Sequence, residues 1–148
     1  MFVGRFAHQL DPKGRLVLPS TFRARFAEGA YLTYGKDGCI EVWTPEAFER
    51  RGEELTAQAE RNELDRAELR AFFHNAFHVT PDGQGRILVG QDLRDFAGLR
   101  QGVAVAGTGD HVELWDPDLY EGEQARGAAL RSRSQRPALA SLTDTRTS

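Results

Sequence analysis

The chain of 148 residues has little sulfur and no long apolar run, and both shortages narrow its class. Cys39 is the only cysteine, so an intramolecular disulfide is excluded and a reducing, cytoplasmic setting is expected. No apolar stretch approaches the roughly 20 residues of a membrane-spanning helix, and residues 1–5 lack the pattern of a secretion signal. The composition predicts a cytoplasmic globular protein without a membrane partner.

A strong net charge is also absent, because the formal charge of −3 argues against a uniformly basic nucleic-acid binder. The charges are unevenly spread, however: residues 1–25 hold five cations and one acid, whereas residues 46–68 hold eight acids. Charges act over about 8 Å at physiological salt, so a local positive surface can form on an acidic protein. Charge therefore permits a nucleic-acid partner without requiring one.

What the chain does have is an internal repeat. Residues 11–18, D-P-K-G-R-L-V-L, recur as residues 82–89, D-G-Q-G-R-I-L-V. Residues 40–48, I-E-V-W-T-P-E-A-F, recur as residues 112–120, V-E-L-W-D-P-D-L-Y. Both recurrences lie about seventy residues apart, as expected for a duplicated unit. We expect two halves related by a pseudo-twofold axis, an arrangement whose paired basic turns suit a repetitive partner such as DNA.

Local patterns predict strands, tight turns and helices in the same order in each half. Residues 2–10 alternate as a half-buried strand does, and the Asp, Pro and Gly of residues 11–14 favour a turn. Thr44-Pro45 and Asp116-Pro117 are helix starts, with an N-cap side chain followed by proline. Helices are expected over residues 20–27, 45–59 and 64–77, and a hairpin joins residues 31–34 to residues 40–43.

This order of motifs resembles the MraZ family. The family pattern is matched by M-F-x-G at residues 1–4 and by H-x-L-D-x-K-G-R-L-x-L-P-x-x-F-R at residues 8–23. The second half matches through D-x-x-G-R-I at residues 82–87 and L-R-x-x-A-G-L at residues 93–99. The resemblance covers roughly residues 1–125. It departs at Gly90, which stands where the first half has Pro19, and at Gln84, which stands where the first half has Lys13.

The resemblance implies a β-rich α+β fold of two tandem swapped-hairpin (SpoVT-AbrB-like) half-barrels, related by pseudo-twofold symmetry and flanked by helices. The first repeat would cover residues 1–60, a connecting helix residues 61–78, the second repeat residues 79–125, and a disordered tail residues 126–148. It also implies a homo-oligomer, expected to be a ring, that binds double-stranded DNA on the nucleoid. Such a regulator would repress the promoter of the division and cell-wall gene cluster through short direct repeats.

The expected DNA contacts lie at the two repeated turns and on cations nearby. Arg15 can donate two hydrogen bonds to guanine or phosphate, whereas a lysine is a point charge better suited to phosphate. The alternative is that Arg15 and Arg86 pair with Asp11 and Asp82, or with an acid of a neighbouring strand, and only hold the turns in shape. The predicted DNA-binding residues are Lys13, Arg15, Arg86, Arg5 and Arg23, and the predicted turn residues are Asp11, Gly14, Asp82 and Gly85.

We find no catalytic constellation in the sequence and expect neither an enzyme nor a cofactor. His74 and His78 are spaced as a metal-ligand pair on a helix would be, but no third ligand accompanies them, so no metal site is expected. Trp43 and Trp115 are assigned to core packing, as are Phe72, Phe73 and Phe77. Two other functions stay open: an antitoxin-like protein-binding module of the same fold type, and a purely structural oligomer.

Overall fold

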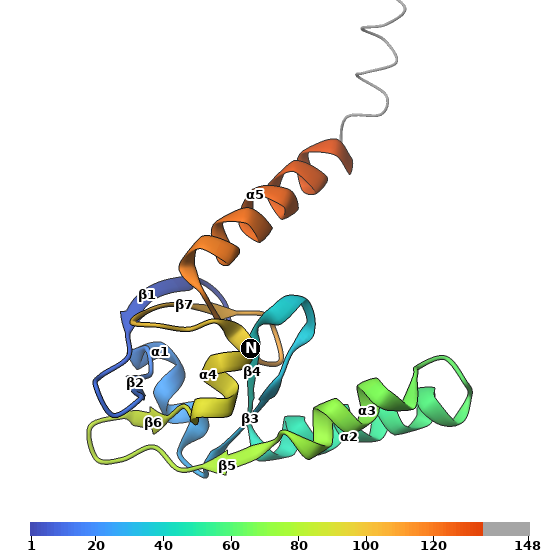
Figure 1. Ribbon diagram of the computed structural model, residues 1–148, viewed down its shortest axis with the longest axis horizontal. Coiled ribbons are helices and arrows are strands. Elements are labelled where there is room, and N and C mark those ends of the chain that lie inside the picture. Colours follow the sequence, from blue (N-terminus) through green and yellow to red (C-terminus); the bar gives the residue numbers. More distant parts are fainter. Residues whose placement is uncertain (135–148) are drawn as a thin grey trace, which may run out of the picture. The chain divides into compact units, whose positions relative to one another are not determined.

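The strands form one six-stranded and one two-stranded antiparallel sheet (Figure 1). The computed structural model describes residues 1–134, in which Met1–Asp116 form one unit and the chain from Pro117 onward belongs to another. The strands are β1 (Arg5–Gln9), β2 (Arg15–Val17), β3 (Ala30–Tyr34), β4 (Ile40–Trp43), β5 (Phe77–Val79), β6 (Arg86–Leu88), β7 (Gly102–Gly107) and β8 (Val112–Trp115). The helices are α1 (Ser20–Arg23), α2 (Pro45–Glu60), α3 (Arg66–His74), α4 (Gln91–Ala97) and α5 (Pro117–Ser134), with short 3₁₀ turns η1 (Ala24–Phe26) and η2 (Lys36–Gly38).

The six-stranded sheet interleaves the two halves in the order β1-β7-β8-β4-β3-β5. β1 of the first half pairs with β7 of the second, and β5 of the second half pairs with β3 of the first. β4 and β8, which carry the same repeat, pair at the centre. The first strand of each half therefore pairs with the β-hairpin of the other half: β1 with the β7–β8 hairpin and β5 with the β3–β4 hairpin. A pseudo-twofold relation predicts this exchange. The α+β class is confirmed, and the finer swapped-hairpin assignment stays a prediction.

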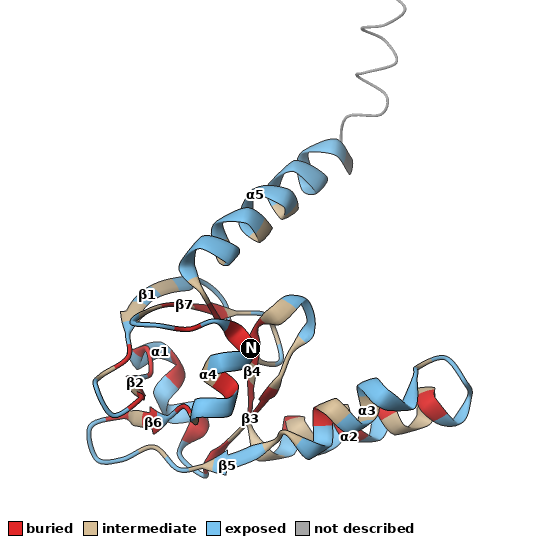
Figure 2. Ribbon diagram, in the orientation of Figure 1, coloured by how far each residue is buried: buried red, intermediate tan, exposed pale blue. Residues whose placement is uncertain are grey.

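The larger of two apolar clusters is shared by both halves. Leu16 and Ile87, partners in the β2–β6 ribbon, are fully buried in it. Burial of apolar surface is the main favourable contribution to folding, so strands that alternate in sequence turn their apolar side chains to this core. The other fully buried large side chains are Phe2, Leu18, Phe26, Leu32, Ile40, Val42, Val89, Val103, Val105 and Leu114. Figure 2 shows buried residues on the inner strands and on the short helices α1 and α4, whereas the edge strands β1 and β5 are intermediate or exposed.

The opposite face of the sheet is partly covered by a helical hairpin, α2 and α3 (Figure 1). The Thr44 side chain accepts a hydrogen bond from the Ala47 N–H at 3.2 Å, which caps α2 as its sequence predicts. The Thr33 hydroxyl donates to the Phe72 carbonyl at 2.6 Å and so ties the last turn of α3 to β3. The second apolar cluster beneath this hairpin contains Trp43, Ala47, Leu55 and Phe72.

Two of the predicted helices differ in extent from those observed. The helix expected over residues 20–27 begins as α1 and then tightens into the 3₁₀ turn η1. The helix expected over residues 64–77 ends at His74, because residues 77–79 form β5 and hydrogen-bond to β3 instead. The stretch of residues 61–78, predicted as a connecting helix, thus contains both α3 and the start of a strand. His74 therefore ends α3 whereas His78 lies in β5, so the two histidines do not share a helix.

The aromatic predictions are confirmed in part. Trp43, Trp115 and Phe72 are buried, as expected for core residues. Phe73 and Phe77 are 41% and 69% exposed, so their assignment to the core was wrong. Phe77 is exposed because it starts the edge strand β5 instead of extending the apolar face of α3.

The unit that follows Asp116 begins with α5, a helix with mostly exposed side chains. α5 extends to Ser134, so residues 126–134 of the predicted disordered tail are helical. The rest of that prediction falls on residues 135–148, which lie outside the described part. Among the described residues, no helix combines the length and apolar character needed to cross a membrane.

Candidate nucleic-acid interface

The first D-x-x-G-R turn is held together by its aspartate. One carboxylate oxygen of Asp11 accepts hydrogen bonds from the backbone N–H groups of Lys13 (2.9 Å) and Arg15 (2.8 Å). The other oxygen accepts from Arg15 Nε at 2.8 Å. The Arg15 backbone N–H, helped by the guanidinium, holds the pKa of Asp11 below its ordinary value. Gly14 completes the turn at φ +81°, a conformation that L side chains rarely adopt.

The second turn repeats this geometry bond for bond. Asp82 accepts from the N–H of Gln84 at 2.9 Å and from the N–H of Arg86 at 3.0 Å, and its second oxygen accepts from Arg86 Nε at 2.7 Å. Gly85 has φ +75°, and the pKa of Asp82 is likewise lowered, first by the backbone N–H of Arg86. The motif therefore specifies a self-contained turn whose arginine is oriented by its own aspartate.

Both arginines stay accessible although each is paired. The side chains of Arg15 and Arg86 are 31% and 25% exposed, and Nε is the atom that each gives to its aspartate. In the β2–β6 ribbon, Arg15 lies opposite Leu88 and Val17 lies opposite Arg86. Because Leu16 and Ile87 point inward, these four side chains share the outer face of the ribbon. The ion pairs of Arg15 and Arg86 with the aspartates of their own turns, expected under the alternative hypothesis, are thus observed. DNA contact by the two arginines stays a prediction.

Arg23, which begins in the first half, reaches the turn of the second half. Its Nη2 donates to the Leu18 carbonyl at 3.0 Å. Its side chain lies across Gly85, where an added Cβ would be 2.6 Å from Arg23 Cδ. The backbone N–H of Leu18 also donates to the Gly85 carbonyl at 3.0 Å. Gly85 is therefore required twice, for its backbone conformation and for the space that Arg23 fills.

Arg94 makes the equivalent contact from the second half to the first. Its Nε donates to the Val89 carbonyl at 3.0 Å, and its Cζ lies 3.0 Å from the position that a Cβ on Gly14 would occupy. The N–H of Val89 donates to the Gly14 carbonyl at 2.9 Å. Each turn thus carries a guanidinium group from the opposite half. The positive surface at either turn is built by both repeats.

Of the remaining predicted DNA-binding residues, Lys13 lies at a turn and Arg5 does not. Lys13 is exposed at the tip of the first turn, where its side chain has no hydrogen-bond or ion-pair partner among residues 1–134. Arg5 lies at the other end of β1, about 20 Å from Asp11 at the usual rise of a strand. Lys13, Arg15, Arg23 and Arg86 lie on or across the turns, whereas Arg5 begins β1 and pairs with Ala106.

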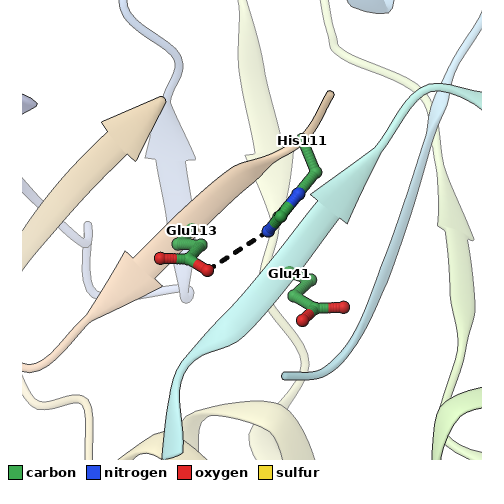
Figure 3. A group of neighbouring side chains, drawn as sticks. All are labelled: Glu41, His111 and Glu113. Carbon is green, nitrogen blue, oxygen red and sulfur yellow. Dashed lines mark hydrogen bonds and ion pairs between the residues drawn. The ribbon is translucent and has the colours of Figure 1, made fainter. Parts of the chain in front are cut away.

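Arg94 was not among the residues that we predicted for this surface. The sequence contained the signal, because Arg94 follows Arg86 at the same spacing as Arg23 follows Arg15. What the sequence does not show is that each of these arginines crosses to the other half. A second group, Glu41, His111 and Glu113, was missed as a cluster because Glu41 is distant in sequence from the other two (Figure 3).

Two halves that exchange strand partners and place an arginine on each other's turn define a duplicated α+β protein. Comparison with known proteins agrees with the duplication. The family model "MraZ protein, putative antitoxin-like" matches residues 1–71 and 72–139. The chain belongs to the MraZ family.

Several curated relatives have the name "Transcriptional regulator MraZ". The relative from Mycoplasmoides gallisepticum is 37% identical over 121 residues, which are 82% of this chain and 85% of the relative. The relative from Micrococcus luteus is 40% identical over 120 residues, or 81% and 84% of the two chains. The relative from Leifsonia xyli subsp. xyli is 33% identical over 142 residues and covers 96% of this chain and 99% of its own.

Proposed function

We propose that this protein binds double-stranded DNA through the outer face of the β2–β6 ribbon and thereby regulates transcription. The observation that carries the proposal is the reciprocal crossing of Arg23 and Arg94, which gathers the cations of both halves at the two turns. A two-stranded ribbon is one of the shapes that fits the major groove of DNA. The names of the relatives support a role in transcription.

The side chains of Arg15 and Arg86 are already oriented to bind a phosphate or a guanine. Because Asp11 holds Nε of Arg15, the guanidinium is oriented before any ligand arrives, and less side-chain entropy is lost on binding. The terminal nitrogen atoms can then donate two parallel hydrogen bonds. Asp82 prepares Arg86 in the same manner.

The two turns are expected to contribute unequally. Lys13 adds a second cation at the first tip, whereas Gln84 takes this place in the second turn. Each lost phosphate contact should lower the slope of log K against log salt by about 0.9. The first turn would therefore account for more of the salt dependence than the second.

The target proposed from the family resemblance is the promoter of the division and cell-wall gene cluster. Repression there would use short direct repeats, read by a homo-oligomeric ring associated with the nucleoid. Two turns per chain, multiplied around a ring, would raise the overall affinity through effective concentration, often by 10²–10⁴. Regular spacing of the DNA repeats would then match regular spacing of the turns.

The test is a footprint on DNA upstream of the protein's own gene, followed by fluorescence-anisotropy titrations over a range of salt concentrations. Lys13→Gln should lower affinity and reduce the salt slope by about 0.9 for each engaged turn, and Gln84→Lys should raise both. Lys36→Gln removes an exposed lysine from η2, a different loop, and is the matched control.

Arg15→Ala should abolish operator binding while the chain elutes from size-exclusion chromatography as the wild type does. Unchanged affinity in Lys13→Gln, Gln84→Lys and Arg15→Ala would exclude the ribbon as the DNA surface. Failure of Arg15→Ala to assemble, with DNA binding lost only for that reason, would assign Arg15 to the fold.

The antitoxin-like alternative is supported by the wording of the family description. It predicts co-purification of the protein with a small toxic partner. The footprint separates the two proposals, because an antitoxin-like module without operator function would leave the evenly spaced repeats unprotected.

A further inference from the structure

The centre of the six-stranded sheet brings two acidic side chains face to face. Glu41 on β4 is directly paired with Glu113 on β8, and the two residues are equivalent in the sequence repeat (Figure 3). Like charges directly opposite each other destabilise an antiparallel pair, and both side chains are half-buried. A cation close to the pair would offset this repulsion.

His111 supplies a nitrogen ligand at the same place. It is the residue that precedes β8, and its Nε2 is 3.2 Å from a Glu113 oxygen. One ligand atom from each of Glu41, His111 and Glu113 lies within 4.8 Å of the others. An imidazole and two carboxylates at this separation form a set that a divalent ion could bridge.

Each of these three side chains also has a hydrogen-bond partner outside the cluster that holds it in position. The Trp43 indole N–H donates to one oxygen of Glu41 at 3.1 Å, and the Trp115 indole N–H donates to one oxygen of Glu113 at 3.1 Å. His111 Nδ1 lies 2.7 Å from an oxygen of Asp110, which leaves Nε2 toward the glutamates. A carboxylate behind a histidine and hydrogen bonds behind ligating carboxylates are typical of protein metal sites.

Glu41 lines a cavity of about 190 Å³, together with Lys36 and Arg51. The His111 and Glu113 side chains, 13% and 20% exposed, lie outside that lining. Arg51 pairs with Glu54 at 2.9 Å, so its charge is already engaged. Cys39 lies near the glutamates but donates its thiol to the Lys36 carbonyl at 3.3 Å. Burial, reinforced by the charges of the glutamates, raises the pKa of Cys39, so the thiol is a poor ligand here.

We propose that Glu41, His111 and Glu113 bind one divalent first-row transition-metal ion, with Zn²⁺ preferred and water completing its coordination. Imidazole nitrogen favours Zn²⁺ over Mg²⁺ or Ca²⁺, and two carboxylates neutralise its charge. Because Glu41 belongs to the first half and His111 and Glu113 to the second, the ion would join the halves at the centre of the sheet. It would stabilise the folded chain, since Glu41 is far from His111 and Glu113 in the unfolded chain.

The test uses the untagged full-length protein, stripped with a chelator and titrated with ZnCl₂ by isothermal calorimetry. We expect one ion per chain, with at least tenfold weaker binding in His111→Gln and in Glu41→Gln. Asp110→Asn keeps an acceptor for Nδ1 but loses the charge, and we expect about tenfold weaker binding. His74→Gln, which removes an exposed histidine at the end of α3, should bind Zn²⁺ as the wild type does.

Glu41→Gln preserves side-chain size and an acceptor for the Trp43 indole, so this variant is expected to fold even if His111→Gln does not. Circular dichroism of each stripped variant checks the fold before titration. Equal Zn²⁺ affinity in the wild type and Glu41→Gln would overturn the proposal, as would loss of binding in His74→Gln. Saturation with MnCl₂ but not with ZnCl₂ would overturn the preference for Zn²⁺.

Discussion

Replacing Gly85 by alanine tests whether the contact of the Arg23 side chain with the turn of the second half stabilises the fold. Gly85 has φ +75°, and an added Cβ would overlap the Arg23 side chain. The left-handed conformation costs a non-glycine residue about 1–2 kcal/mol. Moving Arg23 aside also breaks its hydrogen bond to the Leu18 carbonyl, and a bond from a charged donor contributes about 1.5–3 kcal/mol. Since Arg23 can form new contacts with water, we expect a total loss of about 2–4 kcal/mol.

The assay is equilibrium unfolding in urea at a fixed protein concentration, with the midpoint compared at unchanged slope. Gly83→Ala is the matched control in the same turn, because its Cβ would meet no atom within 4 Å and its φ is not positive. The stability of Gly83→Ala should stay within about 1 kcal/mol of the wild type. Gly14→Ala should cost less than Gly85→Ala, since its Cβ would lie 3.0 Å from Arg94 Cζ, whereas a Cβ on Gly85 would lie 2.6 Å from Arg23 Cδ.

A double-mutant cycle with Arg23→Ala isolates the contact itself. If Arg23 fills the space above Gly85, Gly85→Ala should cost only its backbone strain once Arg23 is truncated, leaving a coupling energy of about 1–2 kcal/mol. Additive effects of Gly85→Ala and Arg23→Ala would refute the claim that this crossing locks the halves.

The other predictions concern His111, Thr33 and Ile87. Burial alone would lower the pKa of His111, but bonds to Glu113 and Asp110 outweigh it and raise the pKa. A raised pKa stabilises the fold below the ordinary value of about 6.5, and this contribution is lost as pH rises through the folded-state pKa. Urea unfolding of the metal-free chain from pH 6 to 9 should show that loss, and His111→Gln should flatten it. Thr33→Val should cost about 1–3 kcal/mol in urea unfolding, because the carbonyl that Thr33 binds would lose a buried donor; an unchanged midpoint would contradict this. Ile87→Ala should cost about 2–5 kcal/mol, measured as a lowered calorimetric Tm, since Ile87 is fully buried.

The parts of this fold that are predictable from sequence are those determined by neighbouring residues. Asp11 and Arg15 interact across four positions, so the turn they form follows from the motif alone. The caps of α2 are local in the same way. The helix expected through Phe77 failed because a distant partner decided the outcome: residues 77–79 hydrogen-bond to β3, and that pairing overrides a helical pattern.

The candidate sites were predictable to a smaller extent because they depend on contacts between the halves. The repeat shows that Arg23 and Arg94 are equivalent, but not that each lies across the glycine of the opposite turn. The cluster around His111 was hidden for the same reason, since Glu41 is far from it in sequence. A periodic pattern places a side chain on a face of a strand. It does not say which strand lies next to that face.

The duplication explains why the two proposed sites differ in symmetry. At the ribbon, both copies of the turn retain the aspartate and the arginine, so the surface is doubled, as a repetitive partner requires. At the centre of the sheet the glutamates are retained, but the position equivalent to His111 is Cys39, whose thiol faces a backbone carbonyl. Only one imidazole is available there, which suits a single ion. A duplicated chain can thus keep a twofold surface for one ligand while it diverges to bind another between the halves, and a metal ion that joins β4 to β8 would stabilise the arrangement that presents both turns.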